Sequence, residues 1–250
     1  MTKSLFLAAA VVFAAAVFAQ TPQGNAFQQE GWMKSGVITF GGGKIEGQTG
    51  PVLGKPISAN EVRTTVQTLS DGSHINRSET DHFYRDGQGR MRTETSTGAI
   101  IYDPVAGFTY DLTLRNKTYT KSPIPKNAVT TIAAAAHYSS VSSHSGQLRK
   151  TTKGGPEPVT EDLPTQMIDG VSARGTRITI TIPSGTVGND HDLSVVNERW
   201  VSDDLKLLVK SSNSDPRFGV TTYELTNILQ APPDPTLFQV PIDYTDATNR

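Results

Sequence analysis

Apolar and polar residues alternate in the segment that organises this chain, residues 171–228. Ile178, Ile180 and Ile182 fall on one side of an extended chain, and the arginine and threonines between them fall on the other. A period of two over β-branched residues is typical of a strand with one buried side. The pattern therefore predicts a half-buried β-strand at the centre of the fold.

The same alternation returns further along the chain. Leu205, Leu207 and Val209 lie on one side, with Leu208 as an exception. The aspartates at 203–204 and the sequence Asp-Pro-Arg-Phe-Gly at 215–219 are residues that favour turns. Strands separated by such turns predict an antiparallel meander.

In the first half of the chain the expected strands come in pairs. Residues 62–69 lead into Ser-Asp-Gly-Ser, and Asp-Gly is among the strongest signals for a hairpin turn. Residues 80–85 and 90–95 flank a second turn, Asp-Gly-Gln-Gly, and strands at 99–103 and 108–114 follow. Regular short strands with turn signals predict a sandwich or a barrel.

Two segments break this rhythm. Residues 123–162 hold prolines, serines and an alanine run at 133–136, which predicts a mobile insertion with one short helix. Residues 20–60 are rich in glycine, which predicts a flexible N-terminal segment with a first short strand at 37–40. The remainder, 61–245, is expected to form a single β-rich domain.

Residues 1–19 have the pattern of a secretory signal peptide. Lys3 precedes an uninterrupted apolar run at 5–18, and small residues stand before Gln20. The run is shorter than the ~20 residues that span a bilayer, and no second long apolar run follows. We therefore expect a periplasmic or secreted protein with no transmembrane segment after removal of the signal.

Charge and cysteine content narrow the function classes. The 23 Lys and Arg residues against 24 Asp and Glu residues leave no cationic excess for nucleic acid. The chain has no cysteine, which excludes disulfides and thiolate metal sites.

The polar residues show no catalytic or metal-binding signature. Asp81 and His82 are neighbours on an expected strand, so their side chains point to opposite sides. The run 189–192, Asn-Asp-His-Asp, consists of ordinary turn formers and offers too few oxygens for calcium. No serine stands in a G-x-S-x-G motif. We predict no catalytic residue, no metal site and no cofactor.

The large apolar side chains admit two interpretations. Phe108, Tyr110 and Leu112 form one side of an expected strand, and Trp200 lies on another strand. Such residues either pack in the core or line a ligand groove.

Several stretches of the sequence resemble a large group of uncharacterised exported bacterial proteins. They are YRDGQGRMRTE, IYDPVAGFTYDL, TQMIDGVSARGTRITITIPSGTVGND, ERWVSDDLKLLVKSSNSDPRFG, YELTNI and DPTLFQVPIDYT. More distantly, the order of elements and the last of these stretches are similar to the periplasmic lipoprotein-carrier fold and to the sensor domains of envelope-stress regulators. This resemblance implies a mainly β fold, a curved antiparallel sheet or half-open β-barrel with one or two short helices. It also implies an apolar groove that accepts acyl chains, and it supplies no catalytic residues.

The sequence thus predicts an exported, non-enzymatic binding protein for an apolar or acyl-bearing ligand in the cell envelope. In a half-open barrel the apolar sides of separate strands would turn inward together. The residues predicted to line the groove are Phe108, Tyr110, Leu112, Ile178, Ile180, Ile182 and Trp200.

Two alternatives stay open. One is an envelope scaffold or protein-interaction module, whose sheet is filled by its own side chains and leaves an exposed strand edge or apolar patch for a protein partner. The other is a hydrolase built from residues distant in the sequence.

Overall fold

The structure, a computed structural model, describes residues 50–124 and 158–248. Within these residues one curved sheet holds twelve strands, in the order β12-β6-β5-β4-β3-β2-β1-β11-β10-β9-β8-β7. The two outermost strands, β12 and β7, do not pair with each other, so the sheet is not closed into a barrel. A single short 3-10 helix, η1, accompanies the sheet in the described part. The predicted fold class, a mainly β curved antiparallel sheet with little helix, is confirmed.

The first half of the chain forms six consecutive antiparallel strands. They are β1 (Ile57–Thr68), β2 (His74–Arg85), β3 (Met91–Glu94), β4 (Gly98–Asp103), β5 (Phe108–Thr113) and β6 (Thr118–Pro123). The predicted turns at 70–73 and 86–89 join β1 to β2 and β2 to β3. Residues 57–60, expected in the flexible N-terminal segment, form the start of β1.

The second half forms another antiparallel meander and a C-terminal segment. Its elements are β7 (Val159–Ile168), β8 (Val171–Ile182), β9 (Leu193–Ser202), β10 (Leu207–Asp215), β11 (Gly219–Leu229), η1 (Pro235–Phe238) and β12 (Thr245–Asp246). Residues 159–162, expected in the insertion, belong to β7. The signal peptide, the first strand at 37–40 and the helix around 133–136 lie outside the described residues.

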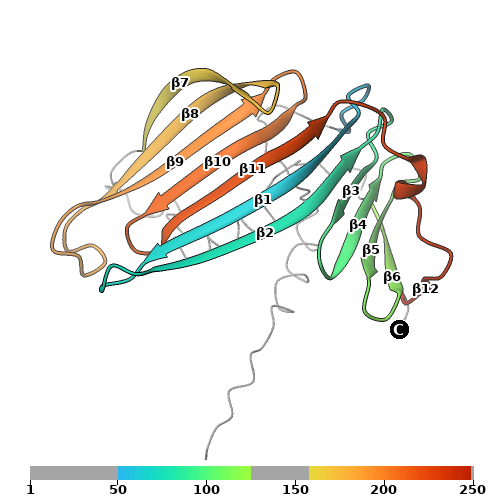
Figure 1. Ribbon diagram of the computed structural model, residues 1–250, viewed down its shortest axis with the longest axis horizontal. Helices are drawn as coiled ribbons and strands as arrows, with labels where there is room; N and C mark the ends of the chain where they lie inside the picture. The colour runs from blue at the N-terminus through green and yellow to red at the C-terminus, as the bar shows by residue number, and fades with distance from the viewer. Residues whose placement is uncertain (1–49, 125–157, 249–250) are drawn as a thin grey trace, which may run out of the picture.

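The two halves meet at the centre of the sheet, where β1 pairs antiparallel with β11. Figure 1 shows these two strands side by side, the first and the last long strands of the described chain. Each half is otherwise a meander of strands that are neighbours in sequence. The β1–β11 pairing is thus the seam that makes one sheet of two.

The irregular position at Leu208 has a structural cause. The register between β9 and β10 shifts between Leu208 and Lys210, so β10 has an extra residue opposite β9. A β-bulge of this kind disturbs the alternation of sides. Leu207, Leu208 and Val209 are accordingly all buried.

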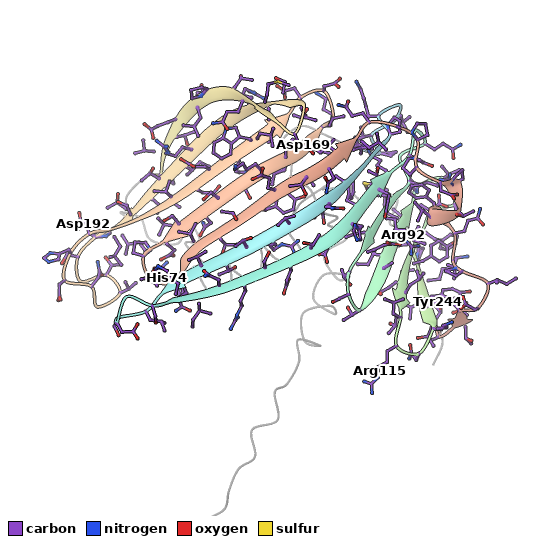
Figure 2. The ribbon with its side chains drawn as sticks, viewed as in Figure 1. His74, Arg92, Arg115, Asp169, Asp192 and Tyr244 are labelled. Carbon is purple, nitrogen blue, oxygen red and sulfur yellow. The ribbon has the colours of Figure 1, made fainter. Side chains whose placement is uncertain are left out.

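The main core joins distant strands of the sheet. Ile168 and Val171, at the turn between β7 and β8, belong to the same buried cluster as Ile57 and Phe83 of β1 and β2. The backbone N–H of Ile228 in β11 donates to Asp169 Oδ2 in the same turn, at 2.6 Å. Asp169 lies near the end of β11 in Figure 2. Since β9 and β10 lie between β8 and β11 in the sheet, the sheet must be curved for this hydrogen bond to form.

A second, smaller core lies under the C-terminal segment that carries Tyr244, on the part of the sheet that carries Arg92 (Figure 2). Val240 and Tyr244 pack against Ala99, Ile101 and Leu112.

The C-terminal segment also covers the side of β3 that carries the charged residues Arg92 and Glu94. Arg92 donates to the carbonyl of Leu237 at 3.0 Å, and the Arg90 guanidinium lies over the Phe238 ring at 5.0 Å. Residues 239–241 follow η1 outside any strand, and β12 adds an edge strand that runs parallel to β6.

Candidate functional site: one side of the curved sheet

Strand pairing places residues from separate strands on one side of the sheet. Ile178 in β8 stands opposite Asn197, which is opposite Asn213, and the row continues through Thr221 to Thr65 in β1. Because side chains alternate along a strand, Thr65 shares its side with Glu61. We call this side of the sheet the Glu61 face.

The three isoleucines of β8 lie on the Glu61 face, as alternate residues of one strand. Ile178 and Ile180 are half-buried, and Ile182 is buried. By register, Ile75 of β2 and Ile100 of β4 lie on the same face, and their side chains remain 40% and 36% exposed. The Glu61 face therefore offers aliphatic side chains that the described residues do not fully cover.

The apolar residues of β5 lie on the other side. The pairing from β2 to β5 runs through Phe83, Thr93, Ile100 and Asp111, so Asp111 is on the Glu61 face. Its alternating neighbours Tyr110 and Leu112, together with Phe108, point away from that face. The two triplets expected to turn inward together are thus on opposite sides of the sheet.

The β5 residues already have partners on their own side. Leu112 is buried in the small core beneath Val240 and Tyr244. The Tyr110 ring lies 6.5 Å from the Phe108 ring and 6.3 Å from the Tyr119 ring, and the Lys121 ammonium stands 3.8 Å from the centre of the Phe108 ring. These residues form a packed aromatic cluster with a cation on it.

Trp200 is a member of the main core cluster and is 6% exposed. Its ring closely approaches Gly175, where a Cβ would come within 2.8 Å of the indole nitrogen. A larger residue at 175 would displace the tryptophan. Of the two interpretations of Trp200, core packing is the one that its burial supports.

At the centre of the Glu61 face lies a buried acid that sequence patterns did not single out as functional. The Glu61 side chain is 1% exposed, and the Tyr223 hydroxyl of β11 donates to its Oε1 at 2.9 Å. Burial raises the pKa of Glu61 to about 7, although the hydrogen bond from Tyr223 and the charge of Arg63 oppose this shift. Burial, together with the charge of Glu61, also raises the pKa of Tyr223 well above its ordinary value.

Charged neighbours surround this pair on the same face. Arg63 lies 3.5 Å from Asp81 of β2, and its guanidinium is 6.0 Å from the centre of the Tyr223 ring. Beside them the hydroxyls of Thr65 and Thr221 are 3.3 Å apart. The middle of the Glu61 face is therefore a hydrogen-bonded polar cluster, with aliphatic residues on the strands to either side of it.

Other polar candidates have local structural partners. His82 Nδ1 lies 2.9 Å from the Asn60 side chain, on the opposite side from the buried Asp81, as expected for neighbours on a strand. Asn189 holds its own loop, since its amide donates to the carbonyls of Pro183 at 3.0 Å and His191 at 2.6 Å. In residues 50–124 and 158–248 no group of three or more His, Asp or Glu side chains is placed to bind a metal. In these same ranges no helix has the length and apolar character needed to cross a membrane.

Comparison with known proteins gives a likeness of structure but none of sequence. No family model matches the chain, and no curated protein is significantly similar to it. Among solved structures, the complex of MucA and MucB from Pseudomonas aeruginosa is similar, with a TM-score of 0.42 and 12% identity over 76% of this chain and 56% of that one. This chain thus spans little more than half of the length of the chain it matches there.

Two further solved structures are covered over nearly their whole length. An uncharacterised conserved protein from Thermus thermophilus has a TM-score of 0.41 and 8% identity, over 78% of this chain and 90% of that one. A LolA superfamily protein from Nitrosomonas europaea has a TM-score of 0.31 and 7% identity, over 76% and 92%. The solved structures that this chain resembles thus include a member of the LolA superfamily.

Proposed function

We propose that this protein is an exported, non-enzymatic binding protein for an acyl-bearing ligand in the cell envelope. The observation that carries the proposal is the set of incompletely covered isoleucines on the Glu61 face of an unclosed sheet, namely Ile75, Ile100, Ile178 and Ile180. An open sheet leaves room for a ligand beside its side chains, whereas a small closed barrel fills its own interior. The partner is an acyl chain because these side chains offer only apolar contact.

The energy available from such contact is sufficient for binding. Burial of an acyl chain contributes about 0.8 kcal/mol per methylene group, so even half of a long chain gives measurable affinity. No polar contact is required for this part of the binding energy, and no reaction has to follow it.

We expect the charged variant Ile180→Glu to lose acyl binding. The substitution places a carboxylate on the Glu61 face, where an apolar chain could not compensate its desolvation. The variant Thr181→Glu is the matched control, because residue 181 is the next residue of β8 and points to the opposite side. Native mass spectrometry of delipidated protein mixed with palmitic acid measures uptake, and circular dichroism establishes that both variants are folded.

Two results would overturn the proposal. Folded, delipidated wild-type protein that takes up no acyl ligand at high micromolar concentration would rule out acyl binding. Equal loss of uptake in both variants would show that the Glu61 face is not where the ligand lies.

A protein-interaction role is the second candidate, and the exposed edge of the sheet favours it. Within the described residues β7 pairs only with β8, and its Val159 and Met167 side chains are 59% and 68% exposed. An open strand edge can accept a strand from a partner. Failure of acyl uptake together with co-purification of an envelope protein that protects β7 from hydrogen exchange would favour this role.

The predicted export of the protein can be tested separately from its ligand. We expect exported protein to begin at Gln20, because the small residues before that position fit the signal-peptide cleavage pattern. Intact-mass measurement of protein from the envelope fraction identifies the first residue directly. Full-length chain recovered from the membrane fraction would contradict the expected export.

A further inference from the structure

Arg85 is a buried cation that forms no ion pair with a carboxylate of the described residues. It is the last residue of β2, opposite Ile57 and Met91 in the neighbouring strands, and its side chain is 0% exposed. Since Ile57 and Glu61 are alternate residues of β1, Arg85 also lies on the Glu61 face.

Two of its three nitrogens are engaged by backbone carbonyls. Nε donates to the carbonyl of Lys55 at 2.9 Å, and Nη2 donates to the carbonyl of Leu205 at 2.8 Å. Nη1 is buried and has no hydrogen-bond partner, and no carboxylate of the described residues lies within ion-pair distance of the guanidinium. The nearest acid in sequence, Asp86, is bound to Arg90 at 2.7 Å instead.

An arrangement of this kind is energetically unfavourable unless something else completes it. An unpaired buried charge and an unused buried donor each lower stability. Burial lowers the pKa of Arg85 to about 10, so the guanidinium still carries its charge at neutral pH. The surroundings are apolar, since Ile57, Met91 and Leu205 around it belong to the main core.

The two loops that hold Arg85 are also joined to each other. Lys55 supplies one of the two carbonyls, and Asp204 precedes Leu205, which supplies the other. The side chains of Lys55 and Asp204 form an ion pair on the protein surface, where both are more than 40% exposed. This exposed pair contributes little stability by itself. A ligand that reaches Nη1 therefore has to compensate the two carbonyl hydrogen bonds of Arg85 and the packing of Leu205, and not the surface pair.

We propose that Arg85 binds the carboxylate of a free fatty acid whose chain lies along the Glu61 face. This inference rests on the proposed acyl-binding function and names the head group. A carboxylate supplies the missing negative charge and accepts the hydrogen bond that Nη1 does not make. It also suits the apolar surroundings better than a dianion, because only one nitrogen of the guanidinium is unused.

The test compares two ligands that share one chain. Palmitic acid and methyl palmitate are titrated at pH 8 into delipidated wild-type protein, and the acid is expected to bind on the order of tenfold tighter, since a hydrogen bond to a charged group is lost in the ester. Arg85→Met keeps the apolar stem and should bind both ligands equally. Asp204→Asn, which removes the surface pair but not the guanidinium, should keep the preference for the acid.

The outcomes separate this inference from the function on which it rests. Equal affinity of wild-type protein for acid and ester would show that Arg85 only ties the two loops together, and acyl binding would stand. Binding of neither ligand would overturn both. The wild-type comparison decides the matter even if Arg85→Met does not fold.

Discussion

Glu61→Gln is expected to raise the free energy of unfolding by roughly 3 kcal/mol above pH 7 and to flatten its dependence on pH between about 4.5 and 7. Glu61 has a folded-state pKa of about 7 against an ordinary value of 4.5, because burial disfavours its charged form. Glutamine keeps an oxygen that can accept the Tyr223 hydrogen bond and carries no charge.

The sign follows from where the proton is bound. Between pH 4.5 and 7 the folded protein holds the Glu61 proton and the unfolded chain has lost it. Wild-type stability from this group is fully present below pH 4.5 and is lost as the pH rises through 7. The glutamine variant has no such loss.

Urea unfolding of both proteins at several pH values from about 5 to about 8.5 measures the difference. Glu224→Gln is the matched control, because Glu224 lies in the adjacent strand, is partly exposed and pairs with Lys210 at 3.0 Å. This control should change stability by under about 1 kcal/mol at every pH. If the free energy of unfolding of Glu61→Gln depended on pH as strongly as that of the wild type, the Glu61 carboxylate would have to be solvated in solution.

The second large effect is expected at Gly219, where alanine should destabilise the protein by about 3 kcal/mol. Gly219 begins β11 with a φ of +93°, which L side chains rarely adopt, and a Cβ there would lie 2.2 Å from the carbonyl oxygen of Val66. Since a backbone atom cannot move aside as a flexible side chain can, the end of the β1–β11 pairing would have to separate.

Gly185→Ala separates the two causes of this loss. Gly185 also has a positive φ, +78°, but no atom lies within 4 Å of its Cβ position. The Gly185→Ala variant should lose only the stability that the unfavourable backbone conformation of alanine costs, about 1 kcal/mol. Thermal unfolding of both variants gives the comparison, and equal losses would show that the contact with Val66 is relieved without effect.

Much of the fold could be predicted because period-two patterns and turn residues are local signals. The hairpins at 70–73 and 86–89 contain Asp-Gly, and each lies where two strands meet in the structure. Patterns could not give the strand order, since pairing of β1 with β11 depends on contacts between residues far apart in sequence. The bulge at Leu208 was visible only as a departure from alternation.

The candidate site was harder to predict for a physical reason. Alternation within one strand assigns residues to two sides but does not relate the sides of different strands. For this reason the isoleucines of β8 and the aromatic residues of β5 were expected together and are found apart. Glu61 had one local signal, since it continues the apolar side begun by Ile57 and Ala59. Arg85 had none, because an arginine at the end of a strand is usually exposed.

The seam between β1 and β11 has a consequence for the order of folding. The residues that pair across it, from Ser58 with Leu229 to Val66 with Val220, are far apart in sequence, so closing this loop carries a large entropic penalty. Neither meander needs the other for its own hairpins, and both can form early. The β1–β11 pairing, in contrast, cannot form until residues 219–229 have been synthesised. Over most of the time in which the chain is made, the two meanders are therefore not yet joined into one sheet.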